Sequence, residues 1–467
     1  MSVGNFAFKG LVAIFATGCA IGLARIAETI FLHVPLDPNE GWNAYYAMAA
    51  ASGGRLYPPT HSFMFNNYPP LSYFIVGGLG KLIGDHIFAG RIISFVATLG
   101  VAGWIGAALR MMRVEGWRAL FAALLFVGGL LIFTDYIGMD DPQMLAHAIA
   151  MGGLVLVLRE PRTTQAVSMS ALLLVTAGFF KHNLIALPIA LMTWLAIADR
   201  RSAAKFVGAG MVFAVIGILM FQFAFSTSLL SQLNSPRLWS IDVFTANLRQ
   251  FVIWCDVALF GALALLLIGR GNRHVTLCVV YAAVSVAVGL AFAGGAGVDM
   301  NIWFDAAIAL ALCGGLLLQQ LSERRWLNAG VAVAYTLPLI GGLWLNWDND
   351  WLTRGYWLNP LSEEAAGAQA DIAFLKSHEG PALCEMLSLC YWAGKRGDVD
   401  VFNLGQAYAT HARGERPLIA LIEARHFRVL EFDSLDDFAL GSAVRKAVLS
   451  AYRVDHIDDN GVFLLPR

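Results

Sequence analysis

The feature that most constrains this chain is a series of long apolar runs that recur from the N-terminus to about residue 346. A membrane-spanning helix needs about 20 mostly apolar residues to cross a hydrocarbon core of about 30 Å. Of the 467 residues 58% are apolar and 14% are charged, whereas an ordinary soluble domain has about 25% charged residues. The sequence therefore excludes a single water-soluble core and predicts a polytopic, all-α membrane bundle. The net charge of -1 gives no reason to expect nucleic acid as a partner.

We expect about eleven transmembrane helices, because about eleven runs are long or apolar enough to form one. The runs are 8–30, 87–109, 117–134, 142–159, 166–181, 184–198, 205–225, 248–269, 275–295, 302–321 and 326–346. Two of them, 166–181 and 184–198, are short. A helical hairpin or tilted helices buried within the protein would account for these two.

Lys and Arg residues gather in alternate loops, which predicts the orientation of the chain. The basic set is Lys9; Arg110, Arg113 and Arg118; Arg159 and Arg162; Arg200, Arg201 and Lys205; Arg270 and Arg273; and Arg324 and Arg325. By the positive-inside rule these loops and the N-terminus are cytoplasmic. The C-terminal tail then lies on the outer face, as expected for a multi-pass protein of a bacterial inner membrane. Because ten further spans follow the first, we do not expect that span to be a cleaved signal peptide.

The tail differs in kind from the rest of the chain and predicts a periplasmic α/β domain over residues 347–467, after a transmembrane domain over 1–346. The predicted strands are 381–385, 399–402, 427–432 and 462–465, and the predicted helices are 363–378, 404–412, 416–426 and 436–451. In an oxidising compartment Cys384 and Cys390 could form a disulfide.

The first outer loop, residues 31–86, is the longest in the membrane part and carries several polar groups. These are the acids Asp37 and Glu40 and the amides Asn39 and Asn43. Segments 41–52 and 70–83 look amphipathic and could lie along the membrane interface. A long structured loop of this kind is often functional.

The loop after the third span contains Asp140 and Asp141 and no basic residue. Carboxylates at membrane depth are costly unless they are paired, hydrated or bound to a ligand. The alternative is a solvated loop in which Asp141 and Pro142 begin the next helix, since Asp is a good N-cap and Pro suits the first turn.

Cations and amides also lie at the outer ends of the predicted spans and in the outer loops. Lys181, followed by His182, ends the fifth span, and Arg91 opens the second. Either cation could hold an anionic headgroup, or Lys181 could extend to the interface as an isolated lysine does. A later outer loop contributes Asn301.

These groups predict an outward-facing polar cavity that contains two or more carboxylates and a few cations. Such a cavity suits chemistry on a polar substrate carried by a lipid phosphate. A transporter or flippase is the alternative, although its polar groups are expected nearer the midplane. The chain has no nucleotide-binding P-loop motif and no metal-ligand spacing of Cys and His.

Several motifs in order along the chain add a family resemblance. They are Asp37-Pro-Asn-Glu40-Gly-Trp-Asn-Ala-Tyr, Gly53-Gly-Arg-Leu-Tyr57, Tyr68-Pro-Pro-Leu-Ser-Tyr-Phe74, Gly90-Arg91, Asp140-Asp141-Pro142 and Phe180-Lys181. With the outer C-terminal domain, the chain resembles the polytopic GT-C glycosyltransferases, the group that includes protein O-mannosyltransferases and lipid A aminoarabinose transferases. The resemblance covers nearly the whole length.

The resemblance implies a sugar donor linked to a polyprenyl phosphate and a first-loop acid that acts as base on an acceptor hydroxyl. The family commonly has an Asp-Glu pair where this chain has Asn39-Glu40, so Glu40 ranks first as the base and Asp37 second. A single displacement would invert the anomeric centre.

The remaining candidates are substrate-binding residues. The aminoarabinose transferases have a lysine where this chain has Tyr68, which leaves Lys181 and Arg91 as candidates for the lipid phosphate. Asn39, Asn43, Asp140, Asp141, His182 and Asn301 complete the predicted binding set. The expected partners are the lipid-linked donor, a glycan, lipid or protein acceptor, and membrane lipids. The acids could bind a divalent cation such as Mg²⁺ or Mn²⁺, but their spacing is not diagnostic.

Overall fold

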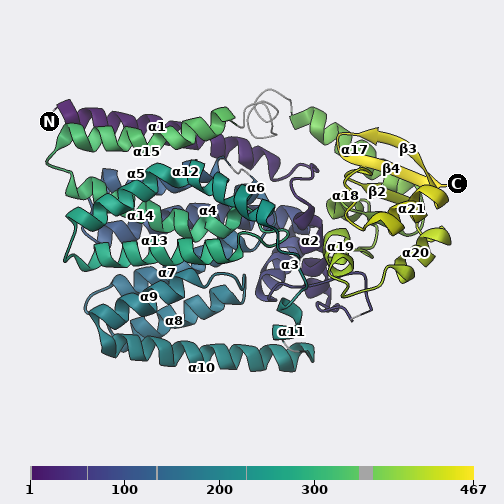
Figure 1. Cartoon of the computed structure of the whole chain (residues 1–467), viewed down its shortest axis with the longest axis horizontal. Coiled ribbons are helices and arrows are strands. Elements are labelled where there is room, and N and C mark those ends of the chain that lie inside the picture. The colour runs from purple at the N-terminus through teal and green to yellow at the C-terminus, as the bar shows by residue number, and fades with distance from the viewer. Residues whose placement is uncertain (1–2, 60, 133–134, 228, 346–360) are drawn as a thin grey trace.

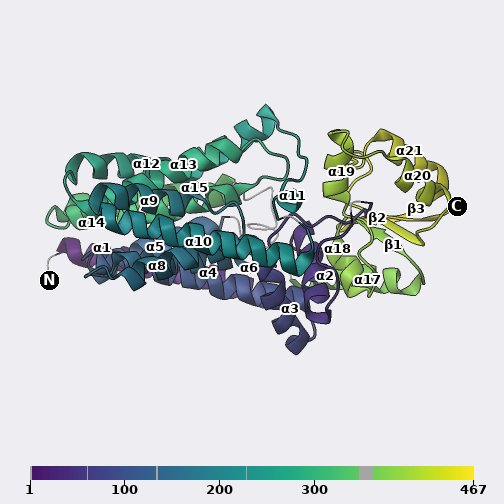
Figure 2. The same cartoon turned by 90° about the horizontal axis from the view of Figure 1, so that it is seen from below.

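The computed structural model describes residues 3–59, 61–132, 135–227, 229–345 and 361–467. They form an elongated molecule in which a long helical bundle carries a smaller α/β domain at one end (Figure 1). Helix α1 (Val3–Thr29) begins at the far end of the bundle, and the C-terminus lies in the α/β domain (Figure 2). The predicted domain boundary at residues 346 and 347 lies outside the described residues.

Eleven described helices overlap the eleven predicted apolar runs, so the structure confirms a polytopic membrane bundle. They are α1, α4 (His86–Met111), α5 (Gly116–Leu130), α7 (Gln143–Leu158), α8 (Thr164–Gly178), α9 (Ala186–Ala198), α10 (Arg200–Phe225), α12 (Ile241–Ile268), α13 (Arg273–Phe292), α14 (Phe304–Gln320) and α15 (Arg325–Leu345). Two short helices, α6 (Asp135–Gly138) and α11 (Leu229–Leu233), lie in loops between them.

Not all of these helices are long enough to cross a bilayer unaided. Within the described residues six segments meet that length and hydropathy: α1 from Phe6, α4, α10, α12, α13, and the 3-10 helix η1 (Met300–Trp303) together with α14. Helix α9 has 13 residues and α7 has 16, which corresponds to about 20–24 Å. Such helices need burial in protein or a locally thinner membrane.

The centre and the periphery of the bundle are distinguished by burial. In the most apolar stretch of η1 and α14, 89% of the residues are buried inside the protein. In the corresponding stretch of α10, 11% are buried. Helix α14 is therefore the central helix, whereas α10 lies along one side of the bundle (Figure 1). A helix that is apolar on all faces must be covered by protein or by lipid, so α10 is a lipid-facing helix.

The first loop folds into two helices, α2 (Pro38–Ser52) and α3 (Leu71–Ile83), close to the two predicted amphipathic segments. Asp37 caps α2 because its side chain accepts a hydrogen bond from the Asn39 N–H, and Pro38 suits the first turn. The helix ends at Gly53, whose φ of 73° is the left-handed conformation that glycine adopts readily. Helix α2 is buried along its first half, whereas α3 exposes large apolar side chains, including Leu82.

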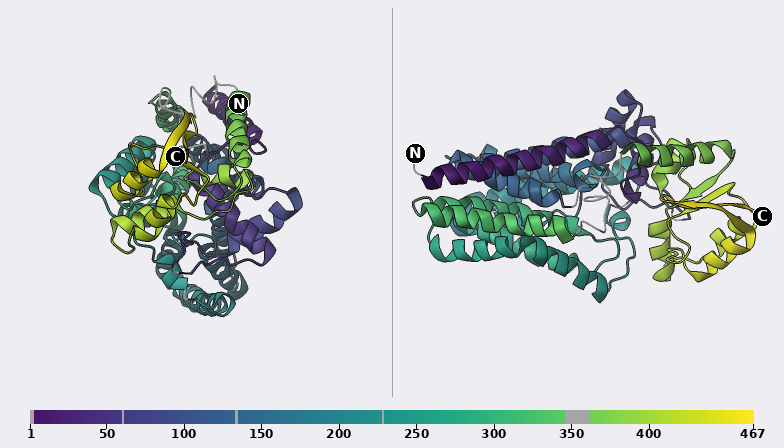
Figure 3. Two further views of the ribbon diagram at one scale, coloured as in Figure 1. Left: turned by 90° about the vertical axis from the view of Figure 1, so that its right-hand side faces the viewer. Right: turned by 90° about the horizontal axis from the view of Figure 1, so that it is seen from above.

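The described part of the C-terminal domain, residues 361–467, contains a four-stranded sheet and five helices. Strand β1 (Ala382–Cys384) pairs in parallel with β2 (Val429–Phe432), β4 (Gly461–Pro466) runs antiparallel to β2, and β3 (Tyr452–Asp458) is the edge strand beside β4. The helices are α17 (Leu361–Ser377), α18 (Leu387–Trp392), α19 (Val401–Ala409), α20 (Arg416–Glu423) and α21 (Ser442–Ala451). Figure 3 shows the sheet between α17 and the group α19 to α21.

Two parts of the predicted domain were wrong. The segment 399–402 is not a strand, because Asp400 accepts a hydrogen bond from the Asn403 N–H and so begins α19. This cap outweighs the strand preference of the valines beside it. Strand β3 was not predicted, although its polar, exposed residues are typical of an edge strand.

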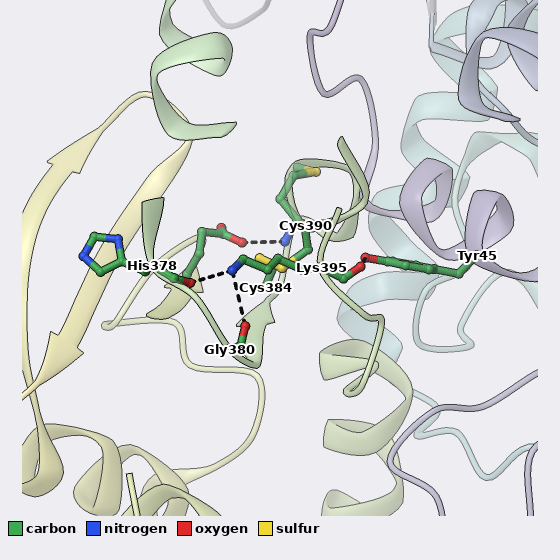
Figure 4. Close-up of a disulfide and its surroundings, with 8 residues drawn as sticks. Tyr45, His378, Gly380, Cys384, Cys390 and Lys395 are labelled. Carbon is green, nitrogen blue, oxygen red and sulfur yellow. Dashed lines mark hydrogen bonds between the residues drawn. A yellow bond between two sulfur atoms is a disulfide. The ribbon is translucent and has the colours of Figure 1, made fainter. Parts of the chain in front are cut away.

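The domain is joined to the bundle through α2, α4 and α18. The Tyr45 hydroxyl donates to the Lys395 carbonyl, and the Trp392 indole donates to Asp85. Cys384 and Cys390 form the disulfide that the sequence allowed, across the turn from β1 into α18 (Figure 4). The Lys395 ammonium closes the same region by donating to the carbonyls of His378 and Gly380 (Figure 4).

Candidate active site between the bundle and the C-terminal domain

Glu40 and Arg91 form a completely buried ion pair between α2 and α4. The Arg91 Nε lies 2.7 Å from Glu40 Oε1, and Nη2 lies 2.6 Å from Oε2. The remaining guanidinium hydrogens go to the carbonyls of Thr29, Leu32 and Val34. An arginine has five N–H donors, so none remains for a ligand. Both residues are fully buried.

Asn43 and Asp140 extend this buried cluster. The Asn43 side-chain amide donates to the Asp140 carbonyl at 2.7 Å, and the Asp140 N–H donates to Glu40 Oε1. The Asp140 carboxyl packs against Gly90, where a Cβ atom would collide with it. Four of the sequence-predicted site residues, Glu40, Asn43, Arg91 and Asp140, therefore form the framework behind the site.

A cavity of about 460 Å³ lies at the junction of the bundle and the C-terminal domain. Five sequence-predicted residues line it: Asp37, Asn39, Tyr68, Asp141 and Asn301. They come from separate parts of the chain, at the starts of α2 and α7, in the first loop and in η1. The cavity thus lies at the ends of helices, where the sequence placed its polar layer.

Asp37 is the sequence-predicted acid of the first loop that faces this cavity. Its place at the N-cap of α2 fixes the carboxyl, and the Asn39 N–H donates to it at 2.7 Å. Burial raises the pKa of Asp37 to about 6, with a smaller contribution in the same direction from the negative charges of Glu40 and Asp141. This value brings the group close to the pH at which a general base works best.

Lys181 forms a second ion pair, with Asp141, directly behind the cavity wall. Its Nζ lies 3.0 Å from Asp141 Oδ2 and 3.9 Å from the centre of the Tyr68 ring. Asp141 also accepts a hydrogen bond from the N–H of Gln143, the first residue of α7, so it contacts both this helix and the lysine. Neither Lys181 nor His182 lines the cavity. The Nδ1 of His182 has no partner within the described structure.

The other wall of the cavity contains residues that the sequence did not single out. Glu385, Asp400, Phe402 and Asn403 belong to the C-terminal domain, and Arg237 precedes α12. Arg237 donates to the Ala296 carbonyl and to Asn403 Oδ1, and its guanidinium lies over the Phe402 ring. Arg237 is one of only six Lys and Arg residues in the predicted outer loops and their borders, and this rarity was the available signal.

The electrostatics of this wall are acidic. Burial raises the pKa of Glu385 to about 7, with smaller contributions in the same direction from the negative charges of Asp433 and Asp437. Burial also raises the pKa of Asp400 to about 6, against the hydrogen bonds from Asn403 that lower it. Asp299, in the loop before η1, accepts a hydrogen bond from the Tyr136 hydroxyl and adds another carboxylate. Arg237 is therefore the cation that lines a largely acidic cavity in the described structure.

Comparison with solved structures identifies the fold. The crystal structure of ArnT from Cupriavidus metallidurans bound to undecaprenyl phosphate matches with a TM-score of 0.62 and 14% identity, over 98% of this chain and 98% of that chain. The apo form of the same protein matches with the same TM-score and identity, over 96% and 98%. The chain has the GT-C fold.

Other comparisons add little to this. An Archaeoglobus fulgidus oligosaccharyltransferase aligns over 95% of this chain and 72% of that chain at 9% identity, but its TM-score of 0.44 is too low to carry an argument. No protein-family model and no curated protein matches the chain. At these identities the similarity to ArnT establishes the fold alone.

The described residues bring together one trio of side chains that could hold a metal ion. Asp371 of α17 and His456 and Asp458 of β3 place their ligand atoms within 4.8 Å of one another. None of the three lines the cavity. This trio therefore does not support the prediction that the acids of the cavity bind a divalent cation.

Proposed function

We propose that this protein is an integral-membrane glycosyltransferase that moves a sugar from a polyprenyl-phosphate donor to an acceptor hydroxyl. The observation that carries the proposal is the single cavity shared by the Asp37 carboxyl, Arg237 and the Asp141 partner of Lys181. A base and cations around one polar cavity are what the displacement requires. The undecaprenyl phosphate bound to the structurally similar ArnT supports a donor of this lipid class.

Asp37 is our candidate for the base, in preference to Glu40. Both oxygens of Glu40 are engaged by Arg91, and its side chain is completely buried. A base must come within hydrogen-bond reach of the proton that it removes. Asp37 lies at the cavity wall and Glu40 does not.

Arg237 and Lys181 are our candidates for binding the lipid phosphate. Arg91, which the sequence favoured, has all its donors engaged by Glu40 and backbone carbonyls. Arg237 lines the cavity directly, and Lys181 adds positive charge behind Tyr68. Positive charge fixed near the leaving phosphate stabilises the charge that develops there.

In the proposed reaction the carboxylate of Asp37 accepts the proton of the acceptor hydroxyl. The acceptor oxygen forms a bond to the anomeric carbon as the bond from that carbon to the lipid phosphate oxygen breaks. The phosphate leaves with the electron pair, and the anomeric centre is inverted. Asn39, Tyr68 and Asn301 line the cavity beside Asp37 and are placed to bind sugar hydroxyls.

We further propose that the end of the bundle carrying the C-terminal domain faces the periplasm of a bacterial inner membrane and that the N-terminus is cytoplasmic. The layout of basic residues along the sequence supports this orientation. The acceptor would then be a glycan, a lipid or a protein that is accessible from that side.

Transfer and transport can be separated by one assay. A transporter acts only across a sealed membrane, whereas a transferase works in detergent. We expect the solubilised full-length protein to transfer sugar from a polyprenyl-phosphate donor, and Asp37→Asn to lower the rate by about 10²–10⁴-fold. The matched control is Asp242→Asn, an exposed acid at the start of α12 outside the cavity. Solute movement in vesicles without transfer in detergent would contradict the proposal.

A further inference from the structure

A second polar pocket lies at the other end of the bundle. Its residues come from the end of α4, the segment after α7, the start of α13 and the end of α14. Helix α4 has 26 residues, so its end lies about 39 Å from its start beside the C-terminal domain. The pocket encloses about 700 Å³ and is separate from the cavity described above.

Positive charge dominates the polar side of this pocket. Arg113 and Arg273 line it, and Arg162 is close enough to act electrostatically on His274 in the same wall. One carboxylate, that of Glu160, lies near these three guanidinium groups. It is 2.6 Å from Arg273 and 3.5 Å from Arg162. Glu160 therefore neutralises part of the charge and leaves an excess of cations.

Two polar groups in the pocket have no partner among the described residues. The guanidinium of Arg113 is exposed and makes no hydrogen bond or ion pair with the described residues, whereas the Nδ1 of His274 is buried without a partner there. The backbone of Arg113 adopts the left-handed φ of 67° after the end of α4. The buried Nδ1 of His274 costs free energy unless a ligand or water satisfies it.

The opposite wall of the pocket is apolar. Met111 ends α4 and Met112 follows it, Leu158 ends α7, and Leu316 belongs to α14. A cationic rim beside an apolar wall at the end of a helix bundle is the arrangement that binds lipid phosphate headgroups.

We propose that this pocket binds a phosphate group, carried either by an anionic membrane lipid or by a soluble phosphate compound. Arg113 and His274 donate to the phosphate oxygens, and Arg273 contributes charge while it remains paired with Glu160. A lipid would place its acyl chains along the apolar wall. This site does not depend on the proposed transferase activity.

The test uses the full-length protein in nanodiscs of phosphatidylcholine with and without phosphatidylglycerol. Native mass spectrometry measures retained lipid, and a thermal-shift assay with inorganic phosphate or pyrophosphate measures soluble binding. Arg113→Asn removes the charge while keeping a residue that tolerates positive φ. Arg113→Lys retains the charge. The matched control is Arg324→Asn, an exposed arginine that does not line the pocket.

We expect Arg113→Asn to bind the phosphate probe about tenfold more weakly, with Arg113→Lys close to the wild type and Arg324→Asn unchanged. Selective retention of phosphatidylglycerol identifies a lipid, whereas phosphate binding without it identifies a soluble compound, and either supports the site. The proposal fails if the wild type retains neither probe or if Arg113→Asn and Arg324→Asn bind equally. Arg273→Gln, a second charge removal in the same wall, serves if Arg113→Asn does not fold.

Discussion

Arg91 and Glu40 are joined by two charge-assisted hydrogen bonds of 2.7 and 2.6 Å in a pair that is completely excluded from solvent. Arg91 also binds the carbonyls of Thr29, Leu32 and Val34. The pair therefore holds the segment that leads from α1 to Asp37. In this arrangement Glu40 supports the proposed catalytic residue three positions before it.

Glu40→Gln should mainly lower stability, whereas Asp37→Asn should mainly lower the rate of transfer. Glu40→Gln leaves the buried Arg91 charge uncompensated, so we expect a loss of about 3–5 kcal/mol in the free energy of unfolding. Asp37→Asn keeps an N-cap residue and should leave stability nearly unchanged while abolishing most transfer. Denaturant unfolding in detergent measures the stability of each variant, and the specific activity of the folded fraction measures its transfer. Full activity in Asp37→Asn together with loss in folded Glu40→Gln would restore Glu40 as the base.

The pH profile of transfer should report the ionisation of Asp37. A base must be deprotonated to act, and burial raises the pKa of Asp37 to about 6. We therefore expect kcat/KM to be low at pH 5, to rise through pH 6 and to level off above it. Replacement by Asn should remove this acid limb from whatever activity remains. A wild-type rate that stays constant between pH 5 and 7 would count against Asp37 as the base.

Lys181 and Asp141 should behave as a coupled pair. Each is buried and the two are 3.0 Å apart, so Lys181→Met or Asp141→Leu alone leaves an unpaired buried charge, at a cost of about 3–5 kcal/mol. The double variant should recover much of that stability while still binding donor weakly. Additive losses in a double-mutant cycle would show that the two are not coupled. The exposed pair Arg445 and Asp436 provides the control, for which we expect no measurable coupling.

Much of the architecture could be predicted because it depends on local composition. Apolar run length gave the eleven helices of the bundle, and the shift to shorter apolar runs indicated a separate α/β tail. The polar layer at helix ends was also predictable, since intramembrane charges are costly. Asp37, Asp141 and Asn301 do meet at one cavity although they lie far apart in the sequence.

The division of roles within that layer could not be predicted. Asp37 and Glu40 are three residues apart, and only the packing of α2 against α4 directs Glu40 towards Arg91, 51 positions away. The acidic wall formed by Glu385 and Asp400 depends on how the C-terminal domain docks, which no local pattern encodes.

The disulfide should stabilise the C-terminal domain and, through it, the cavity. It closes a loop with a sequence separation of 6 between Cys384 and Cys390, and Glu385 and Leu387 within that loop line the cavity. We expect Cys384→Ser with Cys390→Ser to lower stability by about 2 kcal/mol and to weaken transfer. Calorimetry with and without reductant measures the effect. The reductant should not affect the double variant, because the four other cysteines are free and buried.

Gly41→Ala should lower transfer even though alanine favours helix formation more than glycine does. In the interior of an exposed helix Gly→Ala stabilises by about 1 kcal/mol, but a Cβ at Gly41 would collide with the backbone of Leu387 and Ser388 in α18. Gly41→Ala should therefore separate α2 from the C-terminal domain and lower transfer. Gly78→Ala in α3 has nothing within 4 Å of the added carbon and serves as the control. We expect it to keep full activity and gain stability in thermal unfolding. Equal behaviour of the two variants would show that close contact between α2 and α18 is not needed to form the cavity.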